Sequence, residues 1–352
     1  MIKTSYLVLA LFIASSVLSS CSIPSEAPQW DTRWIVPAED VAIEVSEFLP
    51  DEVILTPDGT AFTVEVDTFS FSQSLGEACP ECPELHNQTA LKPAFNTTLE
   101  GGSGLPPKVL SMEVTQAAPQ IHVTNGFNFD PIRPEGGNTG SMILRFYTGA
   151  DGQRLVDEIA IDGADVSFPP GSTLNRSFSV QDDTIKALVR AEIVIDSPAA
   201  DSVLVDTSAS INVFVEPETI LIASAEIEVA DEEFSADPVE LDVEDIEEDM
   251  VDHITSGAFD LFVENPFAIA MNFDILITGP FPDIVKQVQF SDAVASTSRV
   301  EFTQEELHTF LGQPGAMLTG SGTVPTADTT TVTPQDTLRI DTRLDAVYHI
   351  GD

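Results

Sequence analysis

The sequence predicts an all-β protein built from tandem, immunoglobulin-like β-sandwich units with a few short helices, after a cleaved signal peptide. Apolar and polar residues alternate with period two in many runs, as they do in half-buried strands. These runs are rich in Val, Ile, Phe and Thr, which favour strands. The chain also has 24 Pro and 20 Gly, residues that mark the turns between strands. Together these features indicate sandwich folding.

Alternation places the expected strands along the whole chain. The clearest runs lie at 61–71, 192–195, 203–215, 220–229, 259–263, 270–277 and 338–350. Helical spacing of apolar residues predicts one helix over 242–255, with a solvated acidic outer face. Two shorter helical turns are expected at 182–188 and 304–311.

The charge balance excludes several classes of partner. The 352 residues include 58 acidic and 14 basic side chains, for a net charge of −44. Such a chain repels nucleic acids and anionic lipid headgroups. Its hydrophobic fraction of 43 % is too high for a disordered chain. The acidity indicates a solvated surface and suggests adaptation to salt, and the length predicts two or three folded units.

The amino terminus predicts export. Residues 1–20 hold one Lys, an apolar run and a small-residue end, the layout of a secretory signal. The string Leu18-Ser19-Ser20-Cys21 resembles the lipobox of bacterial lipoproteins. That resemblance implies lipidation of Cys21, a membrane anchor through this residue, and placement in the cell envelope, with Ser22 implying the outer membrane. Residues 21–37 then form a tether and an aromatic entry segment, whose two Trp either plug the first β-unit or contact lipid.

The other two cysteines lie three residues apart. Cys79 and Cys82 are expected to form a local disulfide that staples a loop in an oxidising compartment. A redox motif would need a strand before it and a helix after it. A zinc site using His86 would need further ligands that the sequence does not pair.

Two segments resemble each other and indicate an internal repeat. Residues 121–127 and 261–267 both read as a strand followed by Asn, a turn residue and Phe. Farther along, 177–181 resembles 300–304, and each leads into a short helical turn. The expected domains are therefore an N-terminal β-rich region at 38–118, a first sandwich at 119–235, an acidic linker helix at 236–257 and a second sandwich at 258–352.

The stretch Phe-Val-Glu-Asn-Pro-Phe-Ala-Ile-Ala-Met-Asn-Phe at 262–273 is similar to the Asn-Pro-centred strand pair of LEA14-like domains. The resemblance covers about residues 258–350. It implies a small β-sandwich with one short helix at 305–311 and no known catalytic residue.

The sequence contains no phosphate-binding glycine motif, nucleophile elbow or His-Glu-x-x-His motif. No catalytic residue, metal ligand or cofactor is therefore expected. The leading hypothesis is a non-enzymatic, lipid-anchored envelope protein with a structural or protein-binding role. The alternatives are a binder of lipid or glycan, using a groove between domains or the insertion near Arg133, and an unrecognised hydrolase. Arg133 is the candidate ligand contact, with a structural salt bridge as its other interpretation.

Overall fold

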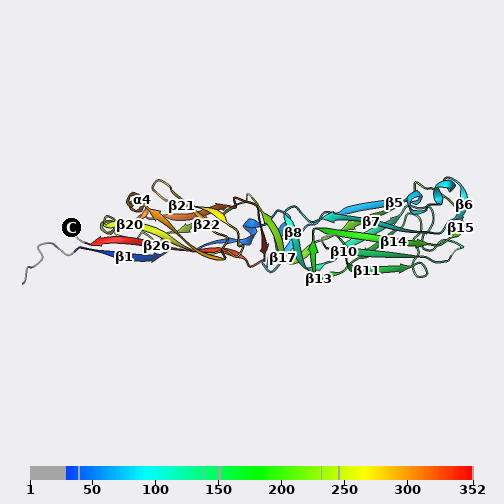
Figure 1. Ribbon diagram of the computed structural model, residues 1–352, viewed down its shortest axis with the longest axis horizontal. Helices are drawn as coiled ribbons and strands as arrows, with labels where there is room; N and C mark the ends of the chain where they lie inside the picture. The colour runs from blue at the N-terminus through cyan, green and yellow to red at the C-terminus, as the bar shows by residue number, and fades with distance from the viewer. Residues whose placement is uncertain are drawn as a thin grey trace, which may run out of the picture.

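A computed structural model describes residues 29–38, 40–136, 138–149, 152–230, 232–244 and 246–350. It is all-β with few short helices, which confirms the predicted fold class. The body is elongated, with the first and last strands side by side at one end and a small two-stranded sheet at the other (Figure 1). We call these the basal end and the distal tip. In the described ranges of the chain, no helix has the length and apolar character to cross a membrane.

The basal sandwich contains both ends of the described chain. One sheet has the order β1 (Trp30–Pro37), β26 (Thr337–Ile350), β20 (Ile254–Glu264) and β23 (Ala295–Phe302), and β2 (Val41–Glu44) also pairs with β26. The facing sheet has the order β18 (Glu233–Ser235), β24 (Met317–Thr323), β21 (Met271–Thr278) and β22 (Ile284–Phe290), and β19 (Val239–Glu240) pairs with β24.

The distal sandwich lies in the other half of the body. One sheet has the order β12 (Thr173–Ser177), β9 (Gln120–Asn125), β16 (Ser210–Glu216) and β5 (Phe69–Ser74). The other has the order β11 (Arg154–Asp162), β10 (Ser141–Thr148), β14 (Leu188–Ser197) and β7 (Phe95–Gly104). The tip carries the pair β6 (Thr89–Lys92) and β15 (Ala200–Leu204), with α2 (Leu75–Ala78) and η2 (Cys82–Leu85) nearby (Figure 1).

A central sheet lies between the two sandwiches (Figure 1). Its order is β13 (Val180–Lys186), β8 (Val109–Ala117), β17 (Ile220–Val229), β4 (Phe62–Val64) and β3 (Val53–Leu55), and β25 (Asp328–Val332) also pairs with β17. The short helix η1 (Val45–Phe48) buries Phe48 against Phe234 and Phe267. The buried apolar residues form one cluster that runs through both sandwiches and the central sheet.

The two sandwiches share one topology. The strand orders β12-β9-β16-β5 and β23-β20-β26-β1 correspond, and so do β11-β10-β14-β7 and β22-β21-β24-β18. In both, the first, second and third strands of the repeat are followed by a fourth that pairs back onto the first. The correspondence follows the chain from β9 to β16 and from β20 to β26, which supports an internal duplication.

The chain visits these sheets in a nested order. It starts in the basal sandwich and enters the central sheet at β3 and β4. It then builds the distal sandwich, with strands β8 and β13 added to the central sheet on the way. It returns through β17 to the basal sandwich, from which β25 pairs back onto β17. Consequently the strands within 38–118 are shared among the basal, central and distal sheets. The edge strands β1 and β18 of the basal sandwich are also far apart in sequence, so long-range pairing decides which strands meet.

Two of the three helical segments expected from the sequence do not form as predicted. Residues 180–186 form strand β13, in register with β8, and Asp183 is buried against Arg154 at 2.5 Å. The expected helix at 242–255 is reduced to the single turn α3 (Glu248–Val251). Before that turn, backbone amides of Leu241 and Gly312 pair segment 241–243 with the loop after α4. In both segments, hydrogen bonds to distant residues replace the bonds that a helix would make.

The third expected helix is confirmed as α4 (Gln304–Phe310). Thr303 caps it: its hydroxyl accepts from the Glu306 amide, and the Glu306 carboxylate accepts from the Thr303 amide. This capping box satisfies donors that the first helical turn leaves unpaired. Leu307 and Phe310 on its inner face are buried.

Candidate functional site

Strand β1 at the basal end is fastened to the last strand by side chains. The Trp34 ring stacks on Tyr348 with centroids 5.0 Å apart, and Asp31 lies 2.8 Å from Nδ1 of His349. Trp30 stays half exposed, at 50 %, and Ile35 is 61 % exposed. Of the two tryptophans, one therefore packs on the sandwich and the other faces solvent at the base.

A second link between the ends of the chain is ionic. Arg33 of β1 makes a two-pronged contact with Asp345 of β26, through Nε at 2.5 Å and Nη2 at 2.6 Å. Arg299 of β23 approaches the same carboxylate at 2.8 Å. Hydrogen bonds from Arg33 and Arg299 hold the pKa of the buried Asp345 carboxyl below its ordinary value. The cluster of Arg33, Asp345 and Arg299 therefore links strands β1, β26 and β23 of the basal sheet.

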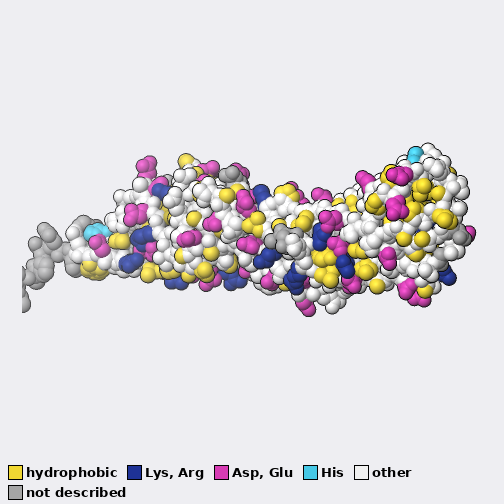
Figure 2. All heavy atoms as spheres, turned by 45° about the vertical axis from the view of Figure 1, so that its right-hand side comes forward, with side chains coloured by type: hydrophobic (Ala, Val, Ile, Leu, Met, Phe, Trp, Pro, Cys, Tyr) yellow, Lys and Arg dark blue, Asp and Glu magenta, His cyan; other side chains and the backbone are white. Residues whose placement is uncertain are grey.

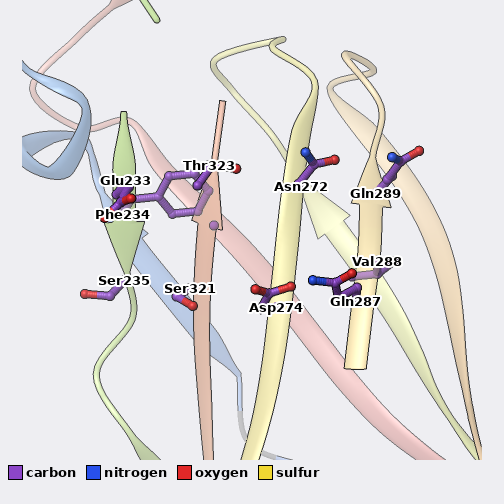
Figure 3. A pocket seen from close by; sticks show the side chains of 11 residues that line it. Glu233, Phe234, Ser235, Asn272, Asp274, Gln287, Val288, Gln289, Ser321 and Thr323 are labelled. Carbon is purple, nitrogen blue, oxygen red and sulfur yellow. The ribbon is translucent and has the colours of Figure 1, made fainter. Parts of the chain in front are cut away.

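An open groove of about 890 Å³ lies on the outer face of the basal sheet β18-β24-β21-β22. Strand register arranges its polar side chains in two rows that cross all four strands (Figure 3). The first row consists of Glu233, Thr323, Asn272 and Gln289. The second row consists of Ser235, Ser321, Asp274 and Gln287. We call this surface the polar groove.

The side chains of the two rows make no hydrogen bond or ion pair with any other residue that the structure describes. The groove floor is well packed instead. A Cβ added to Gly322 would lie 2.2 Å from Cζ of Phe234, and one added to Gly320 would lie 2.2 Å from Cζ of Phe273. These two glycines let the phenyl rings pack beneath β24 while its alternate residues, Ser321 and Thr323, face outward. The side chains of the two rows therefore face solvent from a tightly packed sheet.

The loop that carries the candidate contact Arg133 is held by Asp130. One carboxylate oxygen accepts from the amides of Ile132 and Arg133, at 3.0 and 2.8 Å, and the other accepts from the amide of Phe168 at 2.5 Å. Arg133 itself is exposed and forms no ion pair with a described residue. It lies in the distal sandwich, whereas the polar groove lies in the basal one, so the structure does not bring them together.

The distal tip exposes apolar side chains. Leu91 of β6 is 70 % exposed and Leu204 of β15 is 50 % exposed, and strand register places both on one face of the pair. Figure 2 shows hydrophobic atoms gathered over this end of the molecule. Close by, Cys79 and Cys82 are joined in a disulfide, with Cα atoms 5.3 Å apart and both residues buried.

Beneath the tip lies a buried lysine. Lys92 is 2 % exposed; its ammonium donates to the carbonyls of Pro93 and Pro198 and lies 5.1 Å from the ring centroid of Phe95 and 5.3 Å from that of Phe129. Burial lowers the pKa of Lys92 to about 8. No carboxylate within the described part of the chain pairs with it.

Chemistry-bearing side chains are dispersed. His86 and Thr207 pair near the tip, His122 stacks on Phe214 in the distal sandwich, and His308 belongs to α4. Within the described ranges no group of three or more His, Cys, Asp or Glu side chains is placed to hold a metal ion. Cys21, the expected lipidation residue, lies outside the described residues.

The expectations from the sequence do not include the polar groove, although the sequence carries a signal for it. Polar residues occupy alternate positions in 272–274, 287–289 and 321–323, which marks one solvated face on each strand. The same pattern is ordinary for any half-exposed sheet. Two structural facts distinguish this face from an ordinary half-exposed sheet. Strands β24 and β22 pair on either side of β21, and the polar side chains of the two rows have no partner among the described residues.

No family model matches the chain, and no curated protein matches it. Among solved structures, it is similar to a protein described as secreted from Parabacteroides distasonis, at 9 % identity and a TM-score of 0.26, over 91 % of this chain and 100 % of that one. It is also similar to latent PorU of Porphyromonas gingivalis, at 9 % identity and a TM-score of 0.21, over 77 % of this chain and 22 % of that one.

Proposed function

We propose that this protein is a non-enzymatic, lipid-anchored protein of the bacterial cell envelope that holds a binding tip away from the membrane. The lipobox-like string ending at Cys21 supplies the anchor, and eight residues join it to Trp30, a span of at most about 30 Å. The expected placement is the outer membrane.

The observation that carries the proposal is the placement of the two ends of the described body. Strand β1, the first described strand after the tether, lies at the basal end, and the apolar pair β6–β15 lies at the opposite end (Figure 1). An anchored rod of this kind directs Leu91 and Leu204 away from the membrane. Exposed apolar side chains at such a tip fit an envelope protein partner, whereas the net charge of −44 disfavours nucleic acid.

Membrane fractionation of the full-length chain in a bacterial host tests the anchor. Wild type is expected in the membrane fraction, and Cys21→Ala is expected to move the protein out of it. The double variant Cys79→Ala/Cys82→Ala is the matched control, because it removes two cysteines and leaves Cys21 in place. A Cys21→Ala variant that still sediments with membranes refutes the lipid anchor.

The tip is tested separately. Leu91→Asp/Leu204→Asp is expected to remain in the membrane fraction but to lose chemical cross-links to envelope proteins that wild type forms. The control Ile54→Asp changes another exposed apolar residue, 54 % exposed, in the central sheet. Equal cross-linking by wild type and the tip variant contradicts a binding role for this end.

A further inference from the structure

The duplicated sandwiches use equivalent outer sheet faces in different ways. On the distal sheet β11-β10-β14-β7, every charge in the centre of the face is paired. Arg145 contacts Glu158 at 2.7 Å and Glu192 at 3.0 Å, and Arg190 contacts Glu100 at 2.5 Å. The Arg190 guanidinium also lies 4.1 Å from the ring centroid of Tyr147. These pairs satisfy the charged groups at the centre of the face, whereas Asp196 and Asn96, toward one end of β14 and β7, have no side-chain partner among the described residues.

The corresponding face of the basal sandwich is the polar groove. The polar side chains in its two rows have no hydrogen-bond or ion-pair partner among the described residues. The polar groove has two carboxylates, from Glu233 and Asp274, and no basic side chain in either row. The amides of Asn272, Gln287 and Gln289 lie beside them, and none of these five side chains hydrogen-bonds to another residue in the described part of the chain. Because the two faces hold the same place in a repeated topology, the difference between them does not follow from the fold.

We propose that the polar groove binds an uncharged oligosaccharide. Carboxylates only accept hydrogen bonds, whereas amides and hydroxyls both donate and accept. A ligand that satisfies all of them must present many groups that donate and accept together, as sugar hydroxyls do. The rows cross four strands at about 4.8 Å spacing, a span of about 14 Å, which suits a short linear chain of sugar residues.

The charge and the hydrogen-bonding groups of the polar groove disfavour the other classes of ligand. An anionic chain meets the carboxylates of Glu233 and Asp274 with no cation to offset them, on a protein of net charge −44. A polycation would pair with those two carboxylates but leave the amides and hydroxyls around them without matching groups. An apolar ligand would desolvate the rows with no hydrogen bonds in return, which is costly. An uncharged polyhydroxyl chain is the class that meets both the charge and the hydrogen-bonding pattern.

The test is a glycan array carrying uncharged, cationic and anionic oligosaccharides, probed with the chain from residue 22 onward. Retained oligosaccharides are then measured by isothermal titration calorimetry. Retention of uncharged oligosaccharides is expected. Asn272→Ala/Thr323→Ala, which removes two neighbouring groups of the first row, is expected to weaken their binding at least tenfold. The matched control Asn96→Ala/Thr98→Ala removes the same two residue types from exposed positions of β7 in the distal sandwich and is expected to leave binding unchanged.

A third variant separates sugar recognition from simple charge attraction. Asp274→Asn keeps a hydrogen-bonding side chain but removes one charge, so it is expected to change the affinity for an uncharged sugar less than fivefold. The proposal is overturned if no uncharged oligosaccharide is retained, or if the groove and control double variants behave alike. It is also overturned if only cationic oligosaccharides bind and Asp274→Asn abolishes that binding. All substituted side chains are exposed or half-buried, and circular dichroism verifies that each variant is folded.

Discussion

Asn125 and Asn265 fix the same pair of loops in the two sandwiches. Each side chain is fully buried, and each amide donates to the carbonyl four residues ahead, to Phe129 at 2.9 Å and to Ile269 at 2.8 Å. The second donated bond reaches the loop between the third and fourth strands of the repeat, at Phe168 in one copy and Ser291 in the other. The shared role of these two residues ties the sequence repeat to the shared topology.

Replacing either asparagine with alanine is expected to destabilise its sandwich. Each substitution leaves two carbonyls without a donor, at a cost of about 1–3 kcal/mol for each buried group. Asn125→Ala is expected to cost more, because Asn125 Oδ1 also accepts from the Phe127 amide at 2.9 Å, while Asn265 Oδ1 has no partner among the described residues. Urea unfolding measures the effect, with exposed Asn96→Ala as control. Equal midpoints for Asn125→Ala and the control would contradict this role.

The Asp345 carboxylate is expected to stabilise the fold at neutral pH and to lose that contribution in acid. Its pKa in the folded state lies below the ordinary value of 3.8, chiefly because Arg33 donates to it. The folded state therefore binds fewer protons than the unfolded state, and this contribution is complete above the unfolded pKa and is lost as pH falls through the folded one. Asp345→Asn is expected to lower stability at pH 7 by about 1–3 kcal/mol.

Unfolding curves between pH 2 and pH 7 check that prediction. The gap in stability between wild type and Asp345→Asn should narrow as the pH falls. Asp341→Asn is the control, because its partner Arg343 and the carboxylate itself are both 46 % exposed and such pairs contribute about 0–1 kcal/mol. A gap for Asp345→Asn that stays constant over the whole range contradicts the assignment.

Lys92 is expected to give the protein a rise in stability at alkaline pH. Burial lowers its pKa from 10.5 to about 8 in the folded state, so the unfolded chain holds this proton more tightly. Stability is therefore penalised below about pH 8 and increases as the pH rises from there toward 10.5. Thermal unfolding between pH 7.5 and 10.5 measures it. Lys92→Met should lose this rise, whereas the exposed control Lys186→Met should keep it; identical pH profiles for both variants would show that Lys92 does not titrate as described.

The acidity of the chain is expected to make its stability depend on salt. Acidic side chains are spread along the face shown in Figure 2, and the net charge of −44 makes them repel one another. Raising the salt concentration from 0.01 to 1 M shortens the screening length from about 30 Å to about 3 Å. The melting temperature should rise over this range with NaCl, and a non-ionic osmolyte of equal osmolality serves as control. A melting temperature that is unaffected by NaCl means that the acidity serves another purpose.

Local patterns predicted much of this structure. The strand predicted at 220–229 has the bounds of β17, and the helix expected at 304–311 forms as α4 (Gln304–Phe310). These signals lie within short stretches, since side-chain alternation and a capping box need no distant partner. Segment 182–188 has no comparable local signal, and its pairing with β8 decided its conformation as β13.

The sequence by itself determined the all-β class, the period-two faces and the pair of asparagines that mark the repeat. Tertiary structure decided which strands are neighbours. The first described strand, β1, pairs with the last, β26, and the polar groove forms where β18, β24, β21 and β22 lie side by side. The physical reason is that a strand forms none of its ladder hydrogen bonds within itself. Its backbone groups and one side-chain face are completed by partners that can lie hundreds of residues away, as Arg33 and Asp345 do.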